Sequence, residues 1–336
     1  MVQALPLAAL NGEHWATRVR GGRDGARLAT AMTDFLLDPT DRLTEQERAL
    51  MGSMLAVLIS GIAQELAVRL PSGVTHPIET DLLVERLRQS GLLASDGLLK
   101  LVLRRASLMR MQEGALAGSG YLRQLAGDPD PAVASVAMAV VIARSSSRDP
   151  FGRPGLSLND CDAEAAVHLT YAVAAAITEA SDEQLVAAAV GLLARHDEGE
   201  RLEAIECRLV IALEQAGRLS SETLLTLAAR GEAWMLAEAL ARIARVPVDA
   251  AWEMLTARSP ADLGRLIRLA EQPRDVAAGL IVALAGPLSL ADPADSIAAF
   301  DSMTAGEAAS TRSELRLPQT FRAARAALAG HGQHHL

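Results

Sequence analysis

The residues best suited to chemistry in this sequence are its histidines, and their spacing does not assemble a site. His331, His334 and His335 fall within the last six residues, where a chain end offers no preformed site and no second layer of hydrogen bonds to orient a ligand. His168 lies in an otherwise apolar stretch, which is typical of a hydrogen-bonded packing residue. We therefore expect neither a bound metal nor a cofactor.

The two cysteines, Cys161 and Cys207, lack the CxxC spacing of a zinc or redox motif. A nucleophilic Cys161 would need a neighbouring histidine, and its flanking Asp160 and Asp162 are expected to raise the pKa of the thiol. No catalytic residue is therefore expected, and the chain is not expected to be an enzyme. A pocket that joins His168 to a carboxylate and a cysteine would reverse that expectation.

Two further patterns are weak signals. The glycines of residues 114–120 resemble a phosphate-binding loop, but no strand precedes them and no lysine follows in the required order, so a turn is expected. Arg104, Arg105 and Ser107 match a basic phosphorylation consensus. They belong to a segment with regularly spaced leucines, and we expect them on its solvated face.

Trp234 and Trp252 are candidates for partner binding, because tryptophan is enriched at interaction hot spots and this chain is poor in aromatic residues. Packing in the core is the favoured alternative. Together with apolar residues of an N-terminal helix, the candidate partner-binding residues are Trp234, Trp252, Met51, Leu55, Leu58 and Ile62.

Composition indicates an all-α protein. Half of the 336 residues are hydrophobic but only 3% are aromatic, so burial depends on alanine, leucine, valine, isoleucine and methionine. The net charge of -9 opposes nucleic-acid binding, which needs clustered positive charge. The longest uncharged stretches, 49–64 and 276–291, are sixteen residues each, shorter than a membrane span needs. With no secretory signal pattern and no disulfide framework, we expect a cytoplasmic protein without a membrane span.

The strongest single helix signal covers residues 45–70. Thr44 and Glu47 match a capping box, and apolar residues follow at steps of three and four. A helix of this length often mediates pairing, so a homodimer through residues 45–70 is a possible partner arrangement. A second start signal is the turn 128–131, in which Asp130 precedes Pro131 at the first helical position.

A proline followed two residues later by aspartate recurs at Pro247, Pro260, Pro273 and Pro293, and the first three prolines lie thirteen residues apart. Proline pre-sets the first helical residue and aspartate places negative charge beside the free amides of the first turn. Each unit allows a helix of about ten residues, which is stable only when packed on its neighbours. We expect the units to pair as hairpins in a HEAT-like helical-repeat array, which is an α–α superhelix. In the sequence this array follows an N-terminal part with longer helices.

These signals predict three regions. An N-terminal helical region, 1–144, contains a mobile arm, 1–30, the long helix and the 128–131 turn. Residues 145–160, rich in serine, proline and glycine, are a linker or long loop. A C-terminal helical-repeat domain, 161–336, ends in a flexible tail after about residue 329. Further helices are expected at 78–90, 97–112, 118–125, 162–180, 182–194, 200–216 and 221–230.

The order of residues 236–248 and 261–273, with the segment 41–51, resembles an alphaproteobacterial family of uncharacterised helical proteins known only as a domain of unknown function. The resemblance implies cytosolic bacterial helical repeats and no catalytic residues.

The leading hypothesis is a non-enzymatic protein–protein interaction, scaffold or regulatory protein whose partner is another protein. The alternative is a regulator that responds to a small molecule held in a pocket between the N-terminal helices and the C-terminal array.

Overall fold

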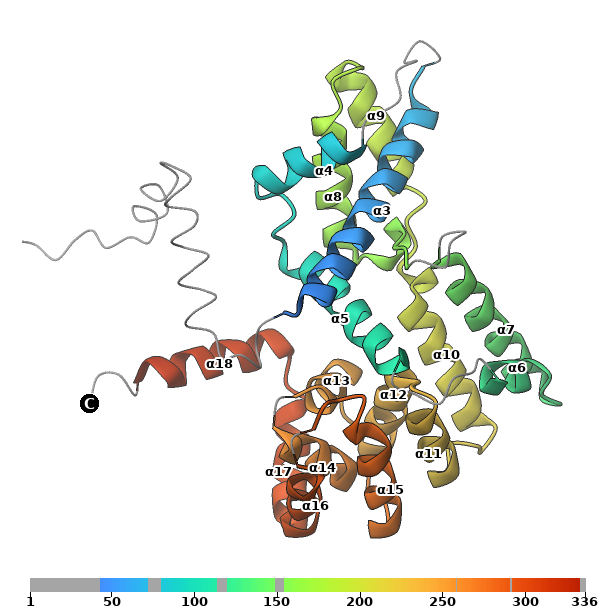
Figure 1. Ribbon diagram of the computed structural model, residues 1–336, viewed down its shortest axis with the longest axis vertical. Coiled ribbons are helices and arrows are strands. Elements are labelled where there is room, and N and C mark those ends of the chain that lie inside the picture. The colour runs from blue at the N-terminus through green and yellow to red at the C-terminus, as the bar shows by residue number, and fades with distance from the viewer. Residues whose placement is uncertain are drawn as a thin grey trace, which may run out of the picture. The chain divides into compact units, whose positions relative to one another are not determined.

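The computed structural model describes residues 43–71, 80–113, 120–148, 154–257, 259–290 and 292–332. These residues form sixteen α-helices and two short 3₁₀-helices, and their one strand-like feature is an isolated bridge between Arg148 and Pro154 (Figure 1). The prediction of an all-α fold is confirmed, whereas a HEAT-like superhelix remains a prediction. The predicted mobile arm, 1–30, lies outside the described residues. At the other end, α18 (Gln319–Gly332) continues past residue 329, and the rest of the predicted tail also lies outside them.

The long helix α3 (Glu45–Arg69) begins where its capping box predicts. The backbone N–H of Glu47 donates to Thr44 Oγ1 at 3.1 Å, and the N–H of Thr44 donates to Glu47 Oε2 at 2.8 Å. Its buried side chains recur at helical spacing, which marks one packed face: Met54, Leu58, Ile59, Ile62, Ala63 and Leu66. By length and composition alone, α3 is the one helix of the described residues that could cross a membrane.

The first hydrophobic core combines α3 with α4 (Thr80–Gln89), the first half of α5 (Asp96–Glu113), α8 (Ala163–Ala176) and α9 (Asp182–Leu193). Helices from both sides of the 145–160 segment therefore share one core. The domain boundary that the sequence predicts at residues 145–160 stays a prediction.

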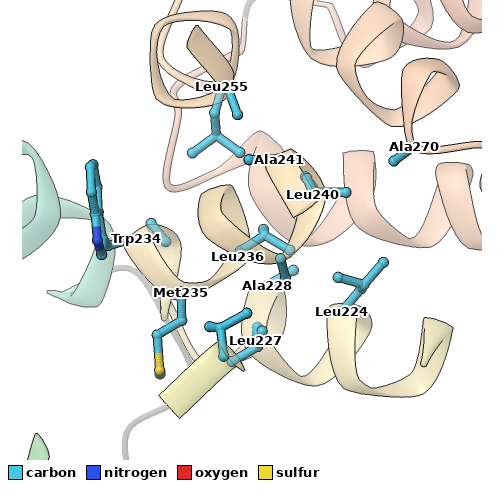
Figure 2. Packing of buried hydrophobic residues seen from close by; sticks show 14 of the residues in the cluster. Leu224, Leu227, Ala228, Trp234, Met235, Leu236, Leu240, Ala241, Leu255 and Ala270 are labelled. Carbon is cyan, nitrogen blue, oxygen red and sulfur yellow. The ribbon is translucent and has the colours of Figure 1, made fainter. Parts of the chain in front are cut away.

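The second hydrophobic core contains the end of α5, then α6 (Gly120–Ala126), α7 (Pro131–Ser146), α10 (Leu202–Gln215), α11 (Ser221–Ala229) and α12 (Ala233–Ala244). Helix α12 is central, because ten of its residues are buried on all sides of the helix. Figure 2 shows Leu236 and Leu240 along α12, with Leu224 and Leu227 of α11 beside them.

Helix α7 starts at the predicted turn. The Asp130 carboxylate accepts the backbone N–H groups of Ala132 at 2.9 Å and Val133 at 3.4 Å, and Pro131 occupies the first helical position. This satisfies two of the free amides that every helix start leaves. The buried face of α7 consists of Val133, Ala137 and Val140.

The four proline-aspartate signals all mark helix starts: α13 (Val248–Leu255), α14 (Pro260–Leu269), α15 (Arg274–Ala285) and α16 (Pro293–Ser302). Pro260 and Pro293 take the first helical position as expected, but Pro247 and Pro273 stand one residue earlier, at the N-cap. That difference is a correction of one residue, and a proline at either place leaves the backbone hydrogen bonds of the helix intact.

These short helices do not pair simply in chain order. Helix α14 packs most extensively on α16, and α15 packs most extensively on α11. The main packing partner of these two helices is therefore not the next helix in the chain. Gly264 allows the close approach of α14 to α16, because a Cβ added there would lie 1.9 Å from the carbonyl oxygen of Ser296. The last helix to join the second core is α17 (Ala305–Leu315).

Candidate ligand-binding site between the two cores

Helix α5 passes through both cores, and Arg105 lies close to the point where its contribution changes from the first core to the second. Leu98, Leu101, Val102 and Ala106 belong to the first core, whereas Leu108 and Met111 belong to the second. Arg105 continues this buried stripe, and its side chain is only 8% exposed. A charge in such a place needs ionic partners, because burial without them is costly.

Two carboxylates surround the Arg105 guanidinium. Its Nε and Nη2 donate to Glu203 Oε1 and Oε2 at 2.8 and 3.0 Å, which is the bidentate geometry that arginine favours. Nη2 also donates to Asp160 Oδ1 at 2.6 Å. The other oxygen of Asp160 accepts the backbone N–H of Ser157 at 2.9 Å, so the loop before α8 is tied to the same cluster.

Arg144, at the end of α7, repeats this arrangement with two other carboxylates. Nε and Nη2 both donate to Glu206 Oε1, at 2.9 and 2.6 Å. Nη1 and Nη2 donate to the two oxygens of Glu232, at 3.0 and 2.5 Å. Glu203 and Glu206 stand one turn apart on α10, so this helix supplies one carboxylate to each arginine.

The charges of this cluster perturb one another. Burial raises the pKa of the Glu206 carboxyl, against the opposing attraction of Arg144. Burial would by itself lower the pKa of Arg144, but the facing carboxylates of Glu206 and Glu232 raise it above its ordinary value. The pKa of Arg105 is likewise raised, because Glu203 and Asp160 outweigh burial. Both arginines therefore stay charged.

Trp234 lies beside this cluster. Its indole Nε1–H donates to the carbonyl oxygen of Glu203 at 3.2 Å, and its ring lies 5.5 Å from that of Trp252. The guanidinium of Arg104 stands 4.6 Å from the Trp234 ring centroid, within range of a cation–π interaction. Figure 2 shows Trp234, which lies at the start of α12.

A cavity of about 80 Å³ opens next to these groups. We call it the junction cavity, since residues of both cores line it. Its apolar wall includes Met54 from α3, Leu108 and Met109 from α5, and Trp234 from α12. Its charged lining residues are Arg105, Arg144, Arg148, Glu206 and Glu232. A concave, mostly apolar site with a few placed polar groups is the usual form of a small-ligand pocket.

The predicted partner-binding residues fall into two groups. Leu58 and Ile62 are buried in the first core and Trp234 in the second, so a partner could reach them only if the core opened. Met51, Leu55 and Trp252 pack against the cores but remain partly exposed. Partner binding stays a prediction. The structure brings Trp234 and Trp252 together, and it places the other four residues on α3.

The candidate chemical residues do not form one site. His168 bonds to the carbonyl oxygen of Leu92 at 2.9 Å, and His196 Nε2 lies 3.1 Å from the carbonyl oxygen of Cys161. Burial, followed by Asp160 and Asp162, raises the pKa of the Cys161 thiol to about 12. The expected direction is thus confirmed, although burial is the larger cause. Burial raises the pKa of Cys207 to about 12 as well.

No group of three metal-ligating side chains occurs in the part of the chain that the structure describes. Residues 114–119, which hold most of the glycine pattern, lie outside that part, and so do His334 and His335.

The prediction for Arg105 was wrong, because it is an enclosed ion-pair partner and not a solvated residue. Arg104 and Ser107 are half-buried. A signal was present: Leu98, Leu101, Arg105 and Leu108 recur at steps of three and four, which places the arginine on the buried stripe of its helix.

No family model, curated protein or solved structure matches the chain.

Proposed function

We propose that this chain is a non-enzymatic regulatory protein that responds to a small ligand in the junction cavity. The observation that carries the proposal is the position of the cavity, whose wall is built from residues of both cores. A ligand bound there contacts both cores at once and stabilises the arrangement in which they meet. Such a ligand therefore raises the free energy of unfolding of the chain.

The test is a thermal-shift screen of small polar and charged compounds on three proteins. Ala233 lines the cavity, so Ala233→Leu fills part of it. Ala187→Leu makes the same change at an exposed position of α9 and is the matched control. We expect compounds that raise the melting temperature of the wild type and of the control but not of Ala233→Leu. Binding that survives Ala233→Leu, or a screen without any stabilising compound, would contradict the proposal.

Protein binding is the second candidate, and an uncharged exposed face of α7 favours it. Met138 and Ile142, one turn apart, are 47% and 59% exposed, and Ser135 extends the row. Exposed apolar rows of this kind often mark interaction sites. We expect the double substitution Met138→Lys, Ile142→Glu to abolish recovery of a specific protein from the native host. Recovery of the same protein with both chains would refute this role for α7.

A homodimer through residues 45–70 is a separate proposal. The candidate partner-binding residues on α3 are Met51, Leu55, Leu58 and Ile62. Leu58 and Ile62 are buried within the chain, so any dimer must use the remaining face of α3. Val57 and Val68 are exposed on that helix. Sedimentation at micromolar concentration tests it, and a strict monomer would exclude the dimer.

A further inference from the structure

Carboxylates outnumber arginines among the described charged groups at the junction cavity. Three arginines line it, and four carboxylates either line it or bind those arginines. The groups are Arg105, Arg144 and Arg148 against Asp160, Glu203, Glu206 and Glu232. The neighbouring Arg104 is offset by Asp249 at 3.5 Å. Among these described groups the carboxylates outnumber the arginines by one.

One carboxylate oxygen of the lining residues receives no bond from these arginines. Arg144 directs both of its bonds with Glu206 to a single oxygen, Oε1, and gives none to Oε2. Glu232 differs, because Arg144 uses both of its oxygens. Glu203 is likewise bound through both oxygens by Arg105. Among the cavity-lining carboxylates, Glu206 therefore offers the oxygen that these arginines leave available.

The remaining wall sets the shape of an occupant. Met54, Leu108 and Met109 present apolar and polarisable groups, which suit an alkyl chain. A cavity of about 80 Å³ has room for an occupant larger than a single water molecule. An anion is disfavoured there, because it would meet Glu206 and Glu232 while both buried arginines are already paired.

We propose that the junction cavity binds a small primary ammonium compound, whose charged end donates to Glu206 Oε2 and whose short alkyl part lies against Met54 and Leu108. This inference rests on the proposed function, since it names the chemical class of the ligand at the same site. Burial raises the pKa of the Glu206 carboxyl, and a cation bound beside it favours the ionised form. The N–H groups of a primary ammonium also supply donors that a quaternary ammonium lacks.

The experiment measures binding of three probes of similar size to the full chain by ligand-observed NMR and thermal shift. The probes are n-butylammonium, butan-1-ol and butanoate. We expect n-butylammonium to bind at least tenfold more tightly than either other probe. Equal or tighter binding of the alcohol or of butanoate would overturn the proposed ligand class, while the cavity would remain a ligand site.

Two matched variants locate the charged end. Glu206→Gln is expected to weaken n-butylammonium binding at least tenfold. Glu238→Gln, the same change at a buried glutamate that does not line the cavity, is expected to weaken it less than threefold. Equal losses in both variants would overturn the assignment to Glu206. If Glu206→Gln does not fold, as judged by circular dichroism, the three-probe comparison on the wild type decides alone.

Failure of this inference differs from failure of the proposed function. If n-butylammonium does not bind but the compound screen yields ligands that Ala233→Leu excludes, only the ammonium class is wrong. If no ligand depends on Ala233, both proposals fall.

Discussion

Arg144→Met is the most informative perturbation of this protein. Methionine keeps much of the apolar stem but removes four hydrogen bonds to Glu206 and Glu232. Both carboxylates stay buried and lose this cationic partner. Breaking a buried ion pair from one side costs roughly 3–5 kcal/mol. Because the arginine side chain is 22% exposed, we take the lower end, about 3 kcal/mol at neutral pH.

The deficit should depend on pH. Burial already raises the pKa of Glu206, and Arg144 opposes that rise, so the pKa increases further in the variant. A carboxyl whose folded pKa exceeds its unfolded pKa contributes most stability below the unfolded pKa, and this contribution is lost as pH rises through the folded value. The variant therefore loses more stability relative to wild type at pH 8 than at pH 5.

The assay is denaturant unfolding at both pH values, with the midpoint reporting stability and an unchanged slope reporting the same extent of unfolding. Adding Glu206→Gln and Glu232→Gln to Arg144→Met removes the unpaired charges and should restore more than half of the loss. Arg88→Met, which breaks an exposed pair with Glu85, is the control and should leave the midpoint nearly unchanged. A loss no larger than that of Arg88→Met, or one that is equal at both pH values, would refute the reasoning.

Three further predictions follow from local geometry. Gly264→Ala should destabilise the chain by roughly 2–3 kcal/mol in thermal or denaturant unfolding, because its Cβ would meet the Ser296 carbonyl oxygen. Gly61→Ala, in the middle of α3 where no atom lies near the added Cβ, should stabilise the chain by roughly 0.5–1 kcal/mol. Equal effects of the two substitutions would contradict the close approach of α14 and α16. Asp130→Ala should cost roughly 1 kcal/mol through loss of the α7 cap, measured in the same way, and no change would rule out that cap. Cys161, with a pKa of about 12, should react with a thiol reagent at pH 8 at least about a thousandfold more slowly than free cysteine until the chain is unfolded, and rapid labelling of the native protein would show that the thiol is not enclosed.

Much of the secondary structure could be predicted, because its signals are local. The capping box of Thr44, the Asp130 cap and the four prolines each act within one helical turn, and every one of them marks a helix start in the structure. The pairing of successive units as hairpins stays a prediction, and the most extensive packing among these helices is between α14 and α16. Pairing of α14 with α16 depends on the absence of a side chain at Gly264, a steric condition that helical periodicity does not contain.

The candidate site could be predicted only in part. A pocket between N-terminal and C-terminal helices was the alternative hypothesis, but Arg105 was assigned to solvent and Arg144 was not singled out. Both arginines bind carboxylates far away in the sequence: Arg105 and Glu203 are 98 residues apart, and Arg144 and Glu232 are 88 apart.

The sequence by itself determined an all-helical chain and where most of its helices begin, since caps, prolines and apolar spacing act over a few residues. Only the tertiary structure decided which helices share a core, and therefore which charges are buried together. The energy of a buried ion pair depends on what encloses it, and that enclosure comes from α5, α7, α10 and α12 only after the chain has folded.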